Sequence, residues 1–179
     1  MSRPKKILRN IIILVILFFI FLKSSGLYLT PLSAHKASER SIHYGPSKVV
    51  HIEDFDKGKY ILCKYDRWIS CNTVKRSLFF FWSFGSQVIG IENDLSKPLS
   101  YTWSGGVREF YKVYGIINDD RIKKIEVTLN NGDILTQDEF YEGMFLVTWK
   151  YINTNFIDFA GIRAYDEENN MIFEEMYGY

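Results

Sequence analysis

Apolar residues are concentrated in one uninterrupted run near the N-terminus. The run extends from Ile11 to Leu22, and Lys23 ends it. The residues before it form a basic head, which contains Arg3, Lys5, Lys6 and Arg9. A basic head followed by an apolar run is typical of an export signal or a membrane anchor, with the basic side kept in the cytoplasm. Residues 1–30 are therefore predicted to be such a segment, and the rest of the chain is expected outside the cytoplasmic membrane.

Two interpretations of this segment remain open. The run from residue 11 to residue 22 is about 18 Å long as a helix at ~1.5 Å per residue, shorter than the ~30 Å hydrocarbon core of a bilayer, which favours a cleaved signal. A longer helix from Ile7 to about Leu29 would span the bilayer if the charged ends of Arg9 and Lys23 reach the interfaces. Cleavage needs small residues, and the segment Ser24–Gly26 offers them directly behind a charge. We expect an uncleaved single-pass anchor, or secretion if the leader is removed.

The segment that follows, residues 31–47, is polar and Ser-rich and carries Pro31 and Pro46. Such a composition is typical of a linker, so we predict a stalk between the membrane and the folded domain. His35 and His43 are expected to be solvated there.

From residue 48 to residue 179 the pattern changes to short runs of β-branched and aromatic residues separated by turn residues, which indicates strands. The expected strands are Val49–Ile52, Lys59–Tyr65, Trp68–Lys75, Leu78–Phe84, Gln87–Glu92, Leu99–Trp103, Phe110–Asn118, Ile122–Leu129, Asp133–Thr136, Met144–Tyr151, Ile157–Tyr165 and Met171–Glu175. Asn131–Gly132 is the clearest hairpin signal, and it predicts a type I′ turn. The fold class predicted is all-β, an antiparallel β-sandwich behind an N-terminal helix.

Composition and charge narrow the function classes. Hydrophobic residues make up 47% of the chain and aromatic residues 17%, which indicates a folded domain rather than a disordered tail. The five basic residues flanking the apolar run leave 17 basic against 21 acidic residues in the remainder. From Asp133 to the end, Lys150 and Arg163 are the basic residues against ten acidic ones. Phosphate binding needs clustered Lys and Arg, so nucleic acid and nucleotide partners are not expected.

The two cysteines, Cys63 and Cys71, lie in an expected hairpin and are placed symmetrically about Arg67. Strands paired in that register would bring them face to face, so a disulfide is one possibility in an oxidising compartment. The alternative is two small buried apolar side chains. No metal site is expected, since neither Cys-x-x-Cys nor His-x-x-x-His spacing occurs in the chain.

Aromatic residues supply the candidate binding surface. Four of them lie close to predicted turns, where flat rings could stack on a sugar or a peptide: Trp68, Tyr101, Trp103 and Trp149. The alternative for this group is a core position. The run Phe79–Phe84 projects aromatic rings to both faces of a strand. It therefore predicts either a central strand buried on both sides, or an exposed surface that recognises a partner or lies close to the membrane.

Catalytic motifs do not occur in the chain. It contains no Gly-x-Ser-x-Gly, no phosphate-binding loop and no dinucleotide fingerprint, and its three histidines lie near the N-terminal approach. No catalytic residue and no cofactor are therefore predicted. Pairs of acidic residues do adjoin turns, and two converging carboxylates would be needed to cleave a sugar bond. An envelope hydrolase or glycan-modifying enzyme using turn carboxylates is the alternative function.

The second half of the chain also carries a resemblance. The strand-and-turn order Gly115–Asp119, Ile125–Gly132 and Ile162–Asp166 resembles that of immunoglobulin-like modules of bacterial surface proteins, over about Tyr114–Phe173. The resemblance implies a non-enzymatic β-sandwich at a bacterial envelope and assigns no functional residues. We therefore predict a membrane-anchored, non-catalytic binding or scaffolding module with an envelope protein or glycan as its partner.

Overall fold

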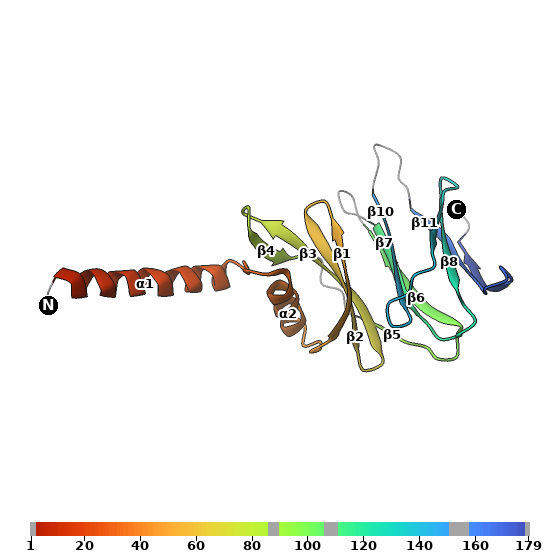
Figure 1. Ribbon diagram of the computed structural model, residues 1–179, viewed down its shortest axis with the longest axis horizontal. Helices are drawn as coiled ribbons and strands as arrows, with labels where there is room; N and C mark the ends of the chain where they lie inside the picture. Colours follow the sequence, from red (N-terminus) through yellow and green to blue (C-terminus); the bar gives the residue numbers. More distant parts are fainter. Residues whose placement is uncertain (1–2, 86–89, 106–110, 151–157, 178–179) are drawn as a thin grey trace. The chain divides into compact units, whose positions relative to one another are not determined.

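The computed structural model describes residues 3–85, 90–105, 111–150 and 158–177 (Figure 1). In chain order the elements are α1 (Arg3–Ser24), α2 (Pro31–Ser41), β1 (Lys48–Phe55), β2 (Gly58–Tyr65), β3 (Trp68–Ser77), β4 (Phe81–Phe84), β5 (Ile91–Glu92), β6 (Leu99–Ser104), β7 (Tyr111–Ile117), β8 (Lys124–Leu129), β9 (Ile134–Gln137), β10 (Met144–Trp149), β11 (Phe159–Tyr165) and β12 (Met171–Met176).

The apolar run and its basic head form the helix α1. The helix ends in a glycine cap: Gly26 has a φ of 65°, and the amide of Leu27 donates to the carbonyl of Leu22 at 3.0 Å. Among the described residues, α1 is the helix that is long and apolar enough to cross a membrane. An N-terminal signal sequence can have the same length and composition. The helix could therefore serve as a signal or as a membrane anchor.

Residues 31–41 form a helix, α2, where a stalk was expected. Thr30 caps its first turn by accepting a hydrogen bond from the amide of Ser33 at 3.1 Å, and Pro31 follows the cap. The expectation that His35 is solvated is wrong, because its side chain is 2% exposed. Ala34 and Ala37 are buried as well. The small side chains of this helix let it pack closely, although its composition resembles that of a linker.

In the described part of the chain the strands form three sheets with antiparallel pairing, which confirms the predicted predominance of antiparallel β-structure. One sheet has the order β1-β2-β3-β4, with β5 also paired to β3. A second has the order β10-β7-β6, and a third has the order β12-β11-β8-β9.

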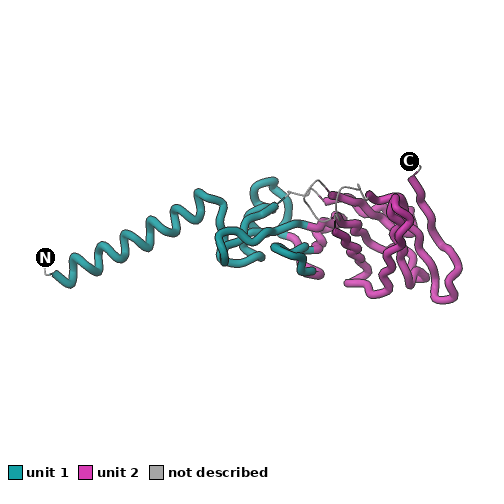
Figure 2. Tube along the Cα trace, turned by 90° about the horizontal axis from the view of Figure 1, so that it is seen from above, with its two compact units in different colours: residues 1–46, 53–61, 72–87 teal, residues 47–52, 62–71, 88–179 magenta. Residues whose placement is uncertain are grey.

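The contacts of the chain divide it into two compact units, drawn in different colours in Figure 2. Unit 1 contains residues 1–46, 53–61 and 72–87, and unit 2 contains residues 47–52, 62–71 and 88–179. This division does not test the predicted boundaries of segment, stalk and domain, which stay predictions.

The hydrophobic core of unit 2 draws on two sheets. One cluster of buried residues joins inward-facing side chains of β6, β7 and β10 to those of β8 and β11. Strand β8 shows the expected alternation, since Ile125, Val127 and Leu129 are buried and the residues between them are not. Burial of one face of each sheet against the other is the main stabilising contribution in this unit.

The hairpin at Asn131–Gly132 is present, but its turn is not type I′. Only Gly132 of the two has a positive φ, 90°, and its amide donates to the carbonyl of Leu129 at 2.9 Å. The amide of Leu129 in turn donates to the carbonyl of Asp133 at 2.9 Å. This is a three-residue loop with a glycine bulge.

The expected strand Leu78–Phe84 is also shorter in the structure. Strand β4 begins at Phe81, and residues 78–80 form the turn that joins β3 to β4. Phe81 and Trp82 are buried, whereas Phe79 is 92% exposed. A central strand buried on both faces is therefore the wrong description of this segment.

Candidate functional site

The candidate site begins on strand β6. Tyr101 and Trp103 are two residues apart, so they lie on the same face of the strand, as does Leu99. Leu99 is fully buried, Tyr101 is half-buried and Trp103 is 42% exposed, so the face opens toward solvent along the strand. Among the strands of the described residues, β6 is the end of its sheet and pairs with β7 alone.

Strand β12 and the residue that follows it, Tyr177, supply the opposite wall. Phe173, Glu175 and Tyr177 alternate along the chain and therefore lie on one face. In the described part of the chain β12 is also the end of its sheet, paired with β11. Two sheet edges thus meet across an open seam in unit 2.

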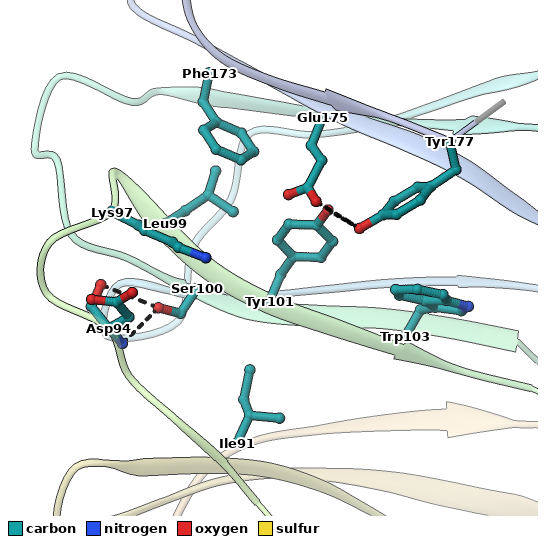
Figure 3. A pocket seen from close by; sticks show the side chains of 10 residues that line it. All are labelled: Ile91, Asp94, Lys97, Leu99, Ser100, Tyr101, Trp103, Phe173, Glu175 and Tyr177. Carbon is teal, nitrogen blue, oxygen red and sulfur yellow. Dashed lines mark hydrogen bonds between the residues drawn. The ribbon is translucent and has the colours of Figure 1, made fainter.

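A cleft of about 190 Å³ occupies this seam (Figure 3). It is lined by Ile91, Asp94, Lys97, Leu99, Ser100, Tyr101, Trp103, Phe173, Glu175 and Tyr177. In Figure 3 the rings of Tyr101 and Tyr177 and the carboxylate of Glu175 point toward one another, with Trp103 at one end and Asp94 at the other.

Ring contacts hold the aromatic walls in place. The ring centroid of Trp103 lies 5.3 Å from that of Tyr177 and 5.0 Å from that of Phe159. Tyr101 makes edge contacts with Phe159 at 5.9 Å and with Phe173 at 6.4 Å. Phe159 is 1% exposed, so the exposed rings rest on the core and keep little freedom to move.

A chain of hydroxyl groups crosses the middle of the cleft. The Tyr177 hydroxyl donates to Glu175 Oε1 at 2.9 Å and lies 3.0 Å from the Tyr101 hydroxyl. Because the hydrogen of Tyr177 goes to Glu175, the Tyr101 hydroxyl is the donor in the second bond. Burial, followed by the hydrogen bond to Tyr177, raises the pKa of Tyr101 well above its ordinary value. Both hydroxyls therefore stay protonated near neutral pH.

The other end of the cleft is a fixed polar loop. Asp94 Oδ1 accepts hydrogen bonds from the hydroxyl of Ser96 at 2.6 Å and from its amide at 3.1 Å. These bonds lower the pKa of the Asp94 carboxyl, with the side-chain bond as the largest cause. Asn118 Nδ2 donates to the carbonyls of Asp94 and Lys97, both at 3.0 Å, and so fixes the loop.

The structure brings two of the four predicted binding residues together in the cleft. Tyr101 and Trp103 share the cleft. Trp149 is 8% exposed and stacks on Tyr111 with centroids 5.5 Å apart, so it belongs to the core. Trp68 lies opposite Glu92 at the start of β3 and is not among the residues that line the cleft.

Sequence reasoning missed the wall formed by Phe173, Glu175 and Tyr177. Their spacing of two residues was visible in the sequence, but nothing in a linear pattern shows which strand faces β6. That proximity depends on how the two sheets pack.

The two cysteines lie outside this cleft. Cys63 and Cys71 are both buried and are thiols in the structure. Whether they form a disulfide in an oxidising compartment stays a prediction. Cys71 also accepts a hydrogen bond, because Lys112 Nζ donates to its carbonyl at 2.7 Å.

The acidic side chains of this region bear on both metal binding and acid–base catalysis. Within the described ranges, no group of three or more His, Cys, Asp or Glu side chains is arranged to hold a metal ion. Two carboxylates, Asp94 and Glu175, do line the cleft. A glycosidase needs one carboxyl group with a raised pKa to protonate the leaving oxygen, whereas the pKa of Asp94 is lowered.

The chain was compared with protein-family models, with curated proteins and with solved structures. None of them matches it, so the resemblance to immunoglobulin-like surface modules over residues 114–173 stays a prediction.

Proposed function

We propose that this chain is a membrane-anchored, non-catalytic binding module of a bacterial cell envelope and that the cleft between β6 and β12 binds a glycan. The observation that supports this most directly is the exposed ring of Trp103 beside a carboxylate and two tyrosine hydroxyls. The immunoglobulin-like form of the domain and its position outside the cytoplasmic membrane belong to the same proposal.

The chemistry of the cleft favours a sugar over other small ligands. The flat faces of Trp103 and Tyr177 suit the apolar C–H faces of a pyranose, and Glu175 and Asp94 offer oxygen acceptors to its hydroxyl groups. The volume of about 190 Å³ is below the roughly 300–1,000 Å³ of enclosed small-molecule sites. A shallow cleft of this size fits one unit of a longer chain that continues along the surface.

The experiment is a binding screen of the full chain in nanodiscs against soluble envelope glycan fragments, followed by isothermal titration calorimetry. Trp103→Ala should weaken binding by at least about fivefold, because a stacking ring contributes on the order of 1–3 kcal/mol. Trp68→Ala is the matched control and should leave the affinity unchanged, since Trp68 does not line the cleft.

Two outcomes would contradict this function. Equal losses from Trp103→Ala and Trp68→Ala would show that the cleft is not the binding site. Binding of peptides and not of glycans at the same cleft would show that the ligand is a peptide and would overturn the proposed glycan ligand.

The alternative is an envelope hydrolase, favoured by one observation, the presence of Asp94 and Glu175 in the same cleft. It predicts release of reducing sugar from an envelope glycan, lost in Glu175→Gln. Binding without turnover in the native chain, retained in that variant, would exclude it.

A further inference from the structure

The turn that joins β3 to β4 in unit 1 is apolar and exposed, and the proposed cleft does not explain it. Its residues Leu78, Phe79 and Phe80 are 61%, 92% and 66% exposed. Three adjacent large apolar side chains in water are unfavourable, and such patches usually mark a contact with a partner or a membrane.

The backbone angles of this turn are unusual for residues as bulky as Leu and Phe. Leu78 has a φ of 42° and Phe79 a φ of 63°, and the amide of Phe80 donates to the carbonyl of Leu78 at 2.8 Å. Glycine or asparagine adopts such angles at little cost, whereas bulky side chains are disfavoured there. Neither turn geometry nor core packing accounts for these residues, so the reason must lie in what their side chains contact.

The residue that follows the turn contacts the apolar helix. Phe81 follows it, and its ring centroid lies 6.4 Å from that of Phe18 in α1. Phe18 lies about 9 Å before the end of α1, at ~1.5 Å per residue. The segment after the helix also pairs with β4, because Tyr28 and Trp82 exchange two backbone hydrogen bonds of 2.7 and 2.8 Å. Figure 1 shows the β3–β4 hairpin beside the end of α1.

We propose that the turn Leu78–Phe80 inserts into the outer leaflet of the bilayer that α1 crosses. This inference rests on the membrane anchoring proposed above. Because Phe81 contacts α1 inside its apolar run, the neighbouring side chains lie at the depth of acyl chains rather than of water.

The base of the hairpin suits the lipid headgroups. Arg76 is exposed, and its guanidinium lies 5.3 Å from the ring centroid of Trp82, its partner in the β3–β4 register. A cation two residues from an apolar tip can contact phosphate groups while the tip contacts acyl chains. With α1 as the first contact and the turn as the second, unit 1 is fixed in orientation instead of rotating about a single helix.

The test uses the full chain in vesicles of phosphatidylcholine and phosphatidylglycerol that contain lipids with a quencher in the acyl chain. A polarity-sensitive fluorophore is attached to Phe79→Cys, to Phe18→Cys as the helix reference and to Leu95→Cys as the matched control. Leu95 is 78% exposed and belongs to unit 2. The parental chain, whose two cysteines are buried, gives the background labelling. Phe80→Cys reports on the same turn if a label at residue 79 disturbs it.

We expect blue-shifted emission and quenching at residue 79 comparable with those at residue 18, and neither at residue 95. Quenching at residue 18 without quenching at residues 79 and 80 overturns the inference and leaves the anchor intact. Absence of quenching at all of these positions overturns the anchor itself. Blue-shifted emission at residue 79 that rises with the protein-to-lipid ratio and is not quenched would assign the turn to a second copy of the chain and also overturns the inference.

Discussion

At the scale of single residues, side chains of the same type differ in burial according to their surroundings. Trp103 is 42% exposed in a cleft and Trp149 is 8% exposed in the core, although both lie on β-strands near predicted turns. His35, in a polar segment, is buried 3.4 Å from Glu39, and Asn72 Nδ2 lies 3.1 Å from its Nδ1. Burial lowers the pKa of His35, against the opposing effect of Glu39.

One residue prediction concerns Asp119, whose carboxylate is bound by Arg121 through Nη2 at 2.6 Å and through the backbone amide at 3.0 Å. These bonds lower the pKa of Asp119 from 3.8 to about 2. The contribution of this pair to the free energy of unfolding is therefore fully present above pH 3.8 and is lost as the pH falls toward 2. Carboxyl NMR titration should give a midpoint of about 2 for Asp119 in the native chain.

Arg121→Ala should raise the midpoint of Asp119 toward 3.8. Arg163→Ala is the control, because Arg163 pairs with Glu174 instead. An Asp119 midpoint that does not change in Arg121→Ala would show that the ion pair does not cause the shift.

At the scale of elements, some helices and strands follow from local sequence signals and others depend on packing. The glycine bulge at Gly132 and the hairpin from β11 to β12 follow from turn residues, because the conformational preferences of glycine and asparagine act locally. Helix α2 has an equally local start signal in Thr30 and Pro31, which the polar composition of the segment concealed. A capping signal is therefore better evidence for a short helix than apolar periodicity.

The element prediction concerns the Thr30 cap of α2. Thr30→Ala removes the acceptor of the Ser33 amide and should destabilise the helix by about 1 kcal/mol, roughly a fivefold shift toward the open state. Hydrogen exchange at the α2 amides should speed up by that factor. Thr30→Ser retains the acceptor and should exchange like the native chain; equal acceleration in both variants would mean that the cap is not responsible.

At the scale of the whole molecule, charge and apolar segments determine where the chain is expected to lie. The basic head precedes α1, and the C-terminal part from Asp133 is strongly acidic. Because basic residues stay on the cytoplasmic side, the acidic part is predicted on the opposite side.

The prediction at this scale is that a reporter fused after Tyr179 is active outside the cytoplasmic membrane. Replacing Arg3, Lys5, Lys6 and Arg9 together by Gln should reduce that activity, because it removes the charge bias that sets orientation. A chain with the whole of α1 deleted is the control and should keep the reporter in the cytosol. Activity in the cytosol for the native fusion would exclude the proposed location.

The sequence by itself determined the features that depend on neighbouring residues: the apolar N-terminal helix, the antiparallel strands and the hairpin at Gly132. Side-chain alternation and turn preferences are local, so they can be read from the order of residues. Only the tertiary structure decided that Tyr101 and Trp103 lie opposite Phe173 and Tyr177, and that Phe81 contacts Phe18. Those contacts join residues far apart in the chain, and they arise when sheets and helices bury their apolar faces against each other.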